Sequence, residues 1–144
     1  MCIRDSLSTV LREKGVGATL VSGARLLSAP AARAGNALEG AVAVAPSGSL
    51  GAEGTPEYDR AVGALKAADA PPDMVSLAGY AAIEAWAEAV RRADGGALAG
   101  VIRALREKPF ATAIGPIAFD ARGDRSGPRF TLFRWSDGRF RELR

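Results

Sequence analysis

The stretch ATLVSGAR at residues 18–25 reads as a short buried strand, ATLV, followed by a loop, SGAR. A second short apolar run, GAVAVA at residues 40–45, is bounded by turn-forming residues and predicts another strand. The segment between them, residues 26–35, is rich in helix-forming residues but is interrupted by a proline. This order of elements, with an apolar fraction of 48% and 24% charged residues, indicates a globular α/β chain.

Three amphipathic helices are predicted next. Thr55 is placed to cap the first helix, with Pro56 at its first position, where a missing N–H costs nothing. The longest helix is expected from about Met74 to Ala93, with Glu84 on its solvent side. Its expected apolar face comprises Leu77, Tyr80, Ile83, Trp86, Ala87 and Val90. A third helix follows near residues 98–105.

Both ends of the chain carry local signals. Residues 7–14 read as the end of a helix that is closed by Gly15. Near the C-terminus, FTLFRW at residues 130–135 has the aromatic and β-branched content of a strand. The Asp137-Gly138 pair then predicts a tight turn into a second strand, so the chain is expected to end in a β-hairpin.

Composition excludes several classes of function. The 144 residues contain no His and one Cys, at position 2, so triads with histidine, His–metal sites and internal disulfides are excluded. Asp120 and Asp124 are read as turn residues and not as a cation site, because too few oxygen ligands surround them. No nucleophile, base and orienting group can be assembled, so neither an enzyme nor a cofactor is expected.

Nucleic-acid binding is the alternative that the C-terminal residues raise. Seven arginines lie between positions 122 and 144 and alternate with phenylalanines. The formal net charge is only +3, and the aromatic residues are needed to bury the hairpin, so a charged edge strand is the preferred interpretation. Binding of a random oligonucleotide that falls with added salt would favour the alternative.

Residues 1–6, MCIRDS, resemble a translated sequencing-adapter stub. The chain is therefore expected to be the C-terminal part of a longer protein. A signal peptide, which has no counterpart in these residues, is expected in the missing N-terminal part.

Several motifs together resemble the C-terminal part of type I periplasmic solute-binding proteins of the branched-chain amino acid ABC transporter family. They are AGNALEG at residues 34–40, GYAAI at 79–83, TAIGPIAFD at 112–120, and the Gly123-Asp124 and Asp137-Gly138 pairs. The resemblance covers about residues 9–144. It implies an α/β fragment of a two-lobed fold, with three-layer lobes, mostly parallel sheets and a C-terminal hairpin.

The resemblance also implies a division of the chain between lobes. Residues 7–72 would belong to lobe two, residues 73–127 to lobe one, and residues 128–144 would return to lobe two. Hinge crossings would fall near residues 71–72 and 123–128. The expected function is capture of a small ligand in the periplasm for an ABC permease in the membrane. A ligand-sensing regulator of the amide-sensor type is the alternative that uses the same fold.

The ligand site is expected partly at the loop of residues 22–25, because ligands in open α/β sheets lie beyond the carboxyl ends of strands. The expected ligand-binding residues are Ser22, Gly23, Ala24, Arg25, Val75 and Tyr80. By the resemblance, amino-acid binders place an acidic residue where this chain has Gly23, and often an aromatic one where it has Val75. Arg25 can instead pair with a carboxylate, so the expected ligands are amino-acid-like molecules, amides or carboxylates, including aromatic acids.

Overall fold

A computed structural model describes residues 3–27, 35–127 and 130–143, and divides into two compact units. The sheet unit comprises Met1–Ser47 and Arg129–Arg144, and the helical unit comprises Gly48–Pro128. The crossing expected near residues 71–72 falls inside the helical unit, so the compact units begin and end elsewhere than the predicted lobe segments. The assignment of residues to lobes remains a prediction.

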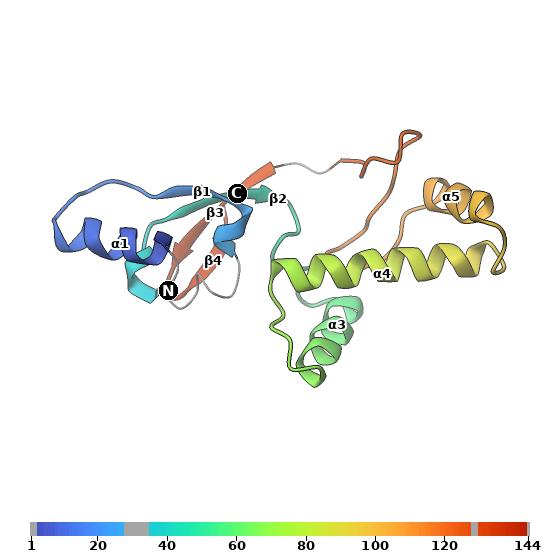
Figure 1. The fold of residues 1–144 in the computed structure, drawn as a ribbon, viewed down its shortest axis with the longest axis horizontal. Helices are drawn as coiled ribbons and strands as arrows, with labels where there is room; N and C mark the ends of the chain where they lie inside the picture. Colours follow the sequence, from blue (N-terminus) through green and yellow to red (C-terminus); the bar gives the residue numbers. More distant parts are fainter. Residues whose placement is uncertain (1–2, 28–34, 128–129, 144) are drawn as a thin grey trace. The chain divides into compact units, whose positions relative to one another are not determined.

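The sheet unit contains one four-stranded sheet, in the order β1-β2-β3-β4. The strands are β1 (Val21–Gly23), β2 (Val42–Pro46), β3 (Phe130–Ser136) and β4 (Arg139–Glu142). Strand β1 pairs with β2 in parallel, whereas β2–β3 and β3–β4 are antiparallel. The α/β class is confirmed, but the expectation of a mostly parallel sheet is wrong for the described strands, because the C-terminal hairpin pairs directly with β2 (Figure 1).

The first strand lies further along the chain than predicted. Its ladder joins Val21 to Val42 and Gly23 to Val44, so Ser22 and Gly23 are strand residues and not loop residues. Directly after it, the 3-10 helix η1 (Ala24–Leu27) buries Leu26 and Leu27. Most of the helix-prone segment, residues 28–34, lies outside the described residues. The described residues on either side of it form η1 and a second 3-10 helix, η2 (Gly35–Leu38).

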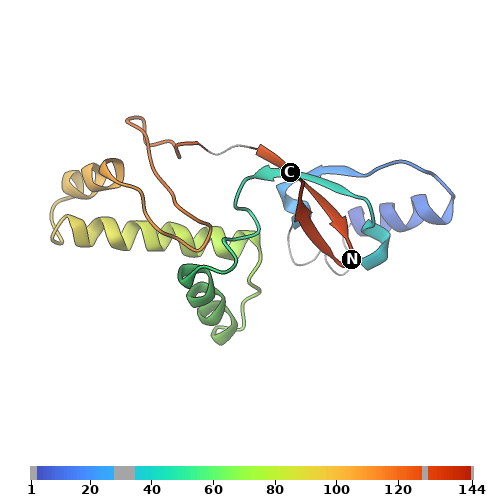
Figure 2. The same ribbon diagram turned by 180° about the vertical axis from the view of Figure 1, so that it is seen from behind.

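The C-terminal hairpin is confirmed, and Figure 2 shows its two strands side by side. Asp137 and Gly138 both have positive φ, at 51° and 80°, as the turn of a two-residue hairpin requires. Trp135 is buried and meets the ring of Phe140 edge-on, with 4.9 Å between centroids. At the other end of the unit, α1 (Ile3–Glu13) ends before Gly15 as expected.

Three helices form the helical unit: α3 (Pro56–Ala67), α4 (Met74–Arg92) and α5 (Leu98–Glu107). Thr55 caps α3 by accepting a hydrogen bond from the Tyr58 N–H, as predicted. Asp73 caps α4 through the N–H groups of Val75 and Ser76. Helices α3 and α5 lie beside opposite ends of α4 (Figure 1).

The buried face of α4 differs from the predicted one. Its buried residues are Leu77, Ala81, Ala85 and Ala89, spaced four apart. Small side chains there let α5 approach closely, and Ala85 and Ala89 share a core cluster with Val101 and Ala104 of α5. Ile83 and Trp86, expected in the core, are instead 65% and 56% exposed.

Two loops pack together beside α4. The segment from Phe110 to Ile117 folds back on itself through a single bridge between these residues. The loop that opens the helical unit joins it where the Ala52 N–H donates to the Ala113 carbonyl, at 2.9 Å. Gly48 approaches so closely that an added Cβ would lie 2.7 Å from the Ile114 carbonyl oxygen.

Replacement of Gly48 by alanine is therefore expected to destabilise the chain more than the same change at Gly54. Both glycines have φ of +82°, but a Cβ on Gly54 would meet nothing within 4 Å. The Gly54→Ala change should cost only the left-handed backbone penalty, about 1–2 kcal/mol. Urea unfolding of both variants measures the difference, and equal losses would show that the Gly48–Ile114 contact does not constrain this loop.

Candidate functional site

The four predicted ligand residues of the sheet unit gather at the carboxyl end of β1. Ser22 and Gly23 close the strand, and Ala24 and Arg25 open η1. Gly23 and Arg25 are exposed, whereas Ser22 and Ala24 are half-buried. No Asp or Glu occupies residues 15–38 of the sequence, so this segment contributes a guanidinium and no carboxylate at the carboxyl end of β1.

The other two predicted ligand residues, Val75 and Tyr80, belong to α4 in the helical unit. Val75 lies in the first turn of the helix and is 62% exposed. Tyr80 is half-buried and packs against the cluster of Ala61, Leu77 and Ala113. The structure thus brings Ser22 to Arg25 together, and it places Val75 and Tyr80 on one helix with different neighbours.

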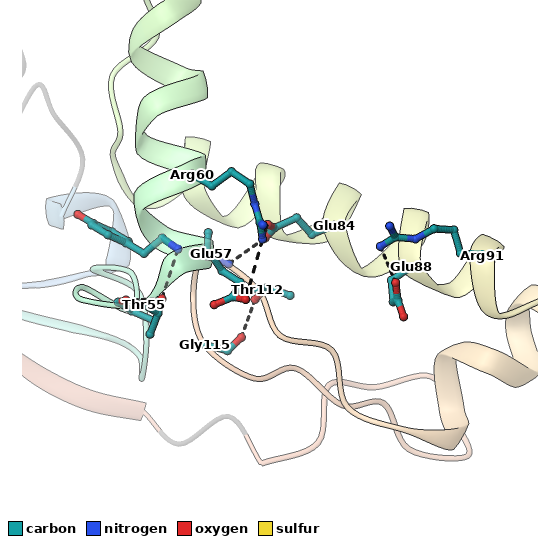
Figure 3. A network of polar contacts seen from close by, with 11 residues as sticks. Thr55, Glu57, Arg60, Glu84, Glu88, Arg91, Thr112 and Gly115 are labelled. Carbon is teal, nitrogen blue, oxygen red and sulfur yellow. Dashed lines mark hydrogen bonds and ion pairs between the residues drawn. The ribbon is translucent and has the colours of Figure 1, made fainter.

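A row of polar side chains on α4 organises the helical unit. Glu84, predicted to face solvent, is only 16% exposed and accepts a hydrogen bond from the backbone N–H of Ala113, at 2.8 Å. Its other oxygen lies 3.7 Å from the guanidinium of Arg60 on α3 (Figure 3). Thr112 closes the same loop by donating to the Gly115 carbonyl, at 2.6 Å. One carboxylate therefore joins α4, α3 and the 110–117 loop.

The next turns of α4 hold the start of that loop. Glu88 pairs with Arg92, four residues further along the helix, at 3.0 Å. It also pairs with Arg91 (Figure 3). The hydrogen bond from Arg92 and the charge of Arg91 hold the pKa of Glu88 below its ordinary value. Arg92 in turn donates to the carbonyls of Lys108 and Pro109 and stacks over the Phe110 ring, 4.2 Å from its centroid.

A groove of about 910 Å³ runs between α3 and α4. Its polar wall includes Glu57, Arg60 and Glu84, and its apolar wall includes Tyr80 and Ile83. Arg60 lies 4.0 Å from Glu57 and 3.7 Å from Glu84, and Glu88 pairs with both Arg91 and Arg92. Because these charges compensate one another, the groove offers no surplus charge to a charged ligand.

Other candidate sites are not supported. Asp120 Oδ1 accepts hydrogen bonds from the N–H groups of Arg122 and Asp124, both at 2.9 Å, so these residues form the predicted turn. Within the described ranges, no three Cys, Asp or Glu side chains gather as a metal site would require. None of the described helices has the length and hydropathy to cross a membrane.

Sequence reasoning missed Glu84 and Arg92 as organising residues. Their spacing with Glu88 is four residues at each step, which places all three on one side of α4. That row could have been read from the sequence as a polar stripe that contacts another segment. The identity of that segment, residues 108–113, depends on the tertiary fold.

The family model described as "Periplasmic binding protein" matches residues 6–139. Among curated proteins, the chain is 37% identical over 86 residues to Leu/Ile/Val-binding protein homolog 3 of Brucella melitensis. The aligned residues make up 58% of this chain and 23% of that protein. The chain is 30% identical over 132 residues to homolog 1 of Brucella suis, covering 89% and 34%. The chain therefore spans about a third or less of the length of these relatives.

Solved structures share the fold. A solute-binding protein of Rhodopseudomonas palustris, solved in complex with benzoate, superposes with a TM-score of 0.76 at 23% identity, covering 96% of this chain and 39% of that one. A leucine-binding protein of Thermotoga maritima gives a TM-score of 0.73 at 17% identity, covering 97% and 40%. Both identities are low, so the likeness concerns the fold alone.

Removal of the Glu84 carboxylate should destabilise the helical unit. Glu84→Ala leaves the buried Ala113 N–H without its acceptor, at an expected cost of about 1–3 kcal/mol. Glu84→Gln keeps an acceptor oxygen and should recover part of that loss. Glu107→Ala, which removes an exposed surface pair with Arg103, should cost about 0.5 kcal/mol or less. Denaturant unfolding measures all three, and equal effects of the Glu84→Ala and Glu107→Ala changes would contradict the role of Glu84.

Tyr58 should ionise only above its ordinary pKa near 10. Burial raises the pKa of the Tyr58 phenol, and the charges of Glu53 and Asp59 raise it further. The chain has two tyrosines, so in a Tyr80→Phe variant absorbance at 295 nm reports Tyr58 alone. The raised pKa means that the folded chain favours the neutral Tyr58 phenol. The contribution of this phenol to the free energy of unfolding is therefore full below about pH 10, and it is lost as the pH rises through the pKa of the folded chain. If the titration midpoint of Tyr58 were no higher in the folded chain than in the chain unfolded by urea, the raised pKa would be contradicted.

Proposed function

The chain belongs to the periplasmic binding protein family, and from that premise we propose that it is part of a solute-binding protein that delivers a small ligand to an ABC permease. The observation that carries the proposal is the family match over residues 6–139. The family consists of binding proteins, so the expectation of no enzymatic activity is confirmed. An extracytoplasmic location follows for the family, and the periplasm is the compartment proposed for this protein.

The complete receptor closes two lobes over its ligand. The sheet unit would belong to one lobe and the helical unit to the other, with the chain crossing near Ser47–Gly48 and again near Pro128–Arg129. The crossing expected near residues 71–72 stays a prediction of its own; it would divide α3 from α4, which pack inside one compact unit. Binding energy favours the closed form, which the permease would recognise. Residues that precede this chain in the whole protein would supply the rest of both lobes.

The ligand is a carboxylate, and an aromatic acid fits best. Arg25 lies exposed just beyond the carboxyl end of β1, and its guanidinium can donate two parallel hydrogen bonds to a carboxylate. The same segment lacks the acidic residue that an ammonium group would need. Related structures were solved with benzoate, p-hydroxybenzoic acid and 3,4-dihydroxy benzoic acid, although another was solved with leucine.

The test is ligand binding by the complete receptor, obtained by reading the gene upstream of the codon for Leu7. Titration calorimetry should detect benzoate or a hydroxybenzoate, and Arg25→Ala should weaken that binding about 10- to 100-fold, as expected for a lost hydrogen bond to a charged group. Arg139→Ala, which changes an exposed arginine of β4, is the matched control and should leave the affinity unchanged.

Tight binding of leucine that is unaffected by Arg25→Ala would refute the carboxylate proposal. A reading frame that starts at this chain would refute the two-lobed receptor itself, because the cleft could not form from these residues alone. If ligand binding instead changed the affinity for a regulatory protein encoded nearby, the sensor alternative would replace transport.

A further inference from the structure

The carboxyl end of β1 belongs to an edge of the sheet at which three strands meet. Strands β1 and β2 are parallel and both end there, at Gly23 and Pro46. Strand β3 is antiparallel to β2 and therefore begins there, with Phe130 paired directly to Pro46 (Figure 1). Arg25 follows the last residue of β1 by two positions. The register thus brings Phe130, from near the end of the chain, to the same edge as the predicted ligand residue Arg25.

Phe130 differs from the other aromatic residues of the sheet unit in its exposure. It is 72% exposed, whereas Phe133 and Trp135 of the same strand are 1% and 2% exposed. Phe140 of β4 is half-buried and meets the ring of Trp135. The core of the hairpin therefore does not use the ring of Phe130. An aromatic ring outside the core, at a sheet edge that also offers a charged group, is suited to contact with a ligand.

The strand surface beside Phe130 is apolar and open. Leu132 pairs with Val44, and Val44 pairs with Gly23, so these three residues lie side by side across the sheet. Phe130 shares their face, because residues two apart on a strand point to the same side. A Cβ on Gly23 would meet nothing within 4 Å, so the space next to Gly23 is open. The strand residues at this edge carry no charge, so the charge beside this surface comes from Arg25 of η1.

The spacing of the strands fits an acid with one ring. Neighbouring strands lie about 4.8 Å apart, so β1 and β3 are about 10 Å apart at this edge. A carboxylate bound by the long side chain of Arg25 can place its ring beside β2, within reach of Phe130. Aromatic rings prefer offset-stacked or edge-to-face contacts with one another, so Phe130 favours an aromatic ring over a saturated ring of similar size.

We propose that Phe130 is a specificity-determining residue of the ligand site and contacts the ring of an aromatic acid whose carboxylate is bound by Arg25. This inference rests on the proposed function, because it requires the sheet unit to carry part of a ligand pocket. It adds a residue of the C-terminal hairpin to the predicted ligand residues of β1, η1 and α4. The guanidinium selects acids, and the ring of Phe130 selects the aromatic ones among them.

The test uses the complete receptor and two ring acids of similar size, benzoate and cyclohexanecarboxylate. Phe130→Leu keeps a large apolar side chain and removes only the aromatic ring. Titration calorimetry should show benzoate binding weakened about 2- to 10-fold in this variant, with cyclohexanecarboxylate binding changed less than about 2-fold. Phe130→Ala should weaken benzoate binding at least as much, and Phe130→Tyr, which keeps the ring, should retain the preference for benzoate.

Leu98→Ala is the matched control, because Leu98 of α5 is an apolar residue of similar exposure, at 74%, in the helical unit. This change should alter the affinity for neither acid. Since Phe130 is exposed, its variants should also unfold at the temperature of the unchanged receptor. Benzoate affinity that Phe130→Ala leaves unchanged would overturn the proposal. An equal loss for both acids with a lower unfolding temperature would also overturn it, since Phe130 would then be a packing residue.

Arg25→Ala in the same receptor separates this inference from the proposed function. If Arg25→Ala weakens benzoate binding and Phe130→Leu does not, the carboxylate site stands and only the role of Phe130 fails. If the receptor binds neither benzoate nor cyclohexanecarboxylate, the proposed carboxylate ligand fails, and the role of Phe130 fails with it.

Discussion

The helical unit depends on the polar row of α4, formed by Glu84, Glu88 and Arg92. Glu84 holds the middle of the 110–117 loop through a backbone N–H, and Arg92 holds its start through two carbonyls and the ring of Phe110. The same loop accepts a hydrogen bond from the Ala52 N–H at the Ala113 carbonyl, so it also connects the first segment of the unit to α4. The Ala113 N–H is buried, so its bond to Glu84 matters more than an ordinary surface pair, because a buried N–H left without an acceptor costs more than the bond contributes.

Features that depend on a few neighbouring residues were predictable from the sequence. Thr55 caps α3 and Asp137-Gly138 forms the hairpin turn because each signal needs only the local backbone conformation. The Glu88–Arg92 pair follows from helical spacing alone. The placement of Ser22 to Arg25 at a strand end was also correct in outline, although the strand took in Ser22 and Gly23.

Features that depend on a distant partner were not predictable. A helix such as α4 has apolar residues over more than half of its circumference, and its sequence does not say which of them meet α5. The structure buries the alanines, since close helix packing rewards small residues, and leaves Ile83 and Trp86 outside. The antiparallel pairing of the C-terminal hairpin with β2 was missed for the same reason: residues 42–46 and 130–134 are far apart in sequence. The role of Val75 and Tyr80 in ligand binding could not be decided from the sequence for the same reason, because it depends on which other segments face α4.

The strands β2 and β3 are neighbours in the sheet, yet the whole helical unit lies between them in the chain. During synthesis, residues 48–128 emerge from the ribosome after β2 and before β3, the strand that pairs with it. The β2–β3 pairing can form only after Phe130–Ser136 have been synthesised, so it is a long-range contact that forms late. Until then the open edge of β2 is exposed to pairing with other chains. The β2–β3 pairing therefore depends on the hairpin, and a chain that stops before Phe130 retains only the β1–β2 pairing of this sheet.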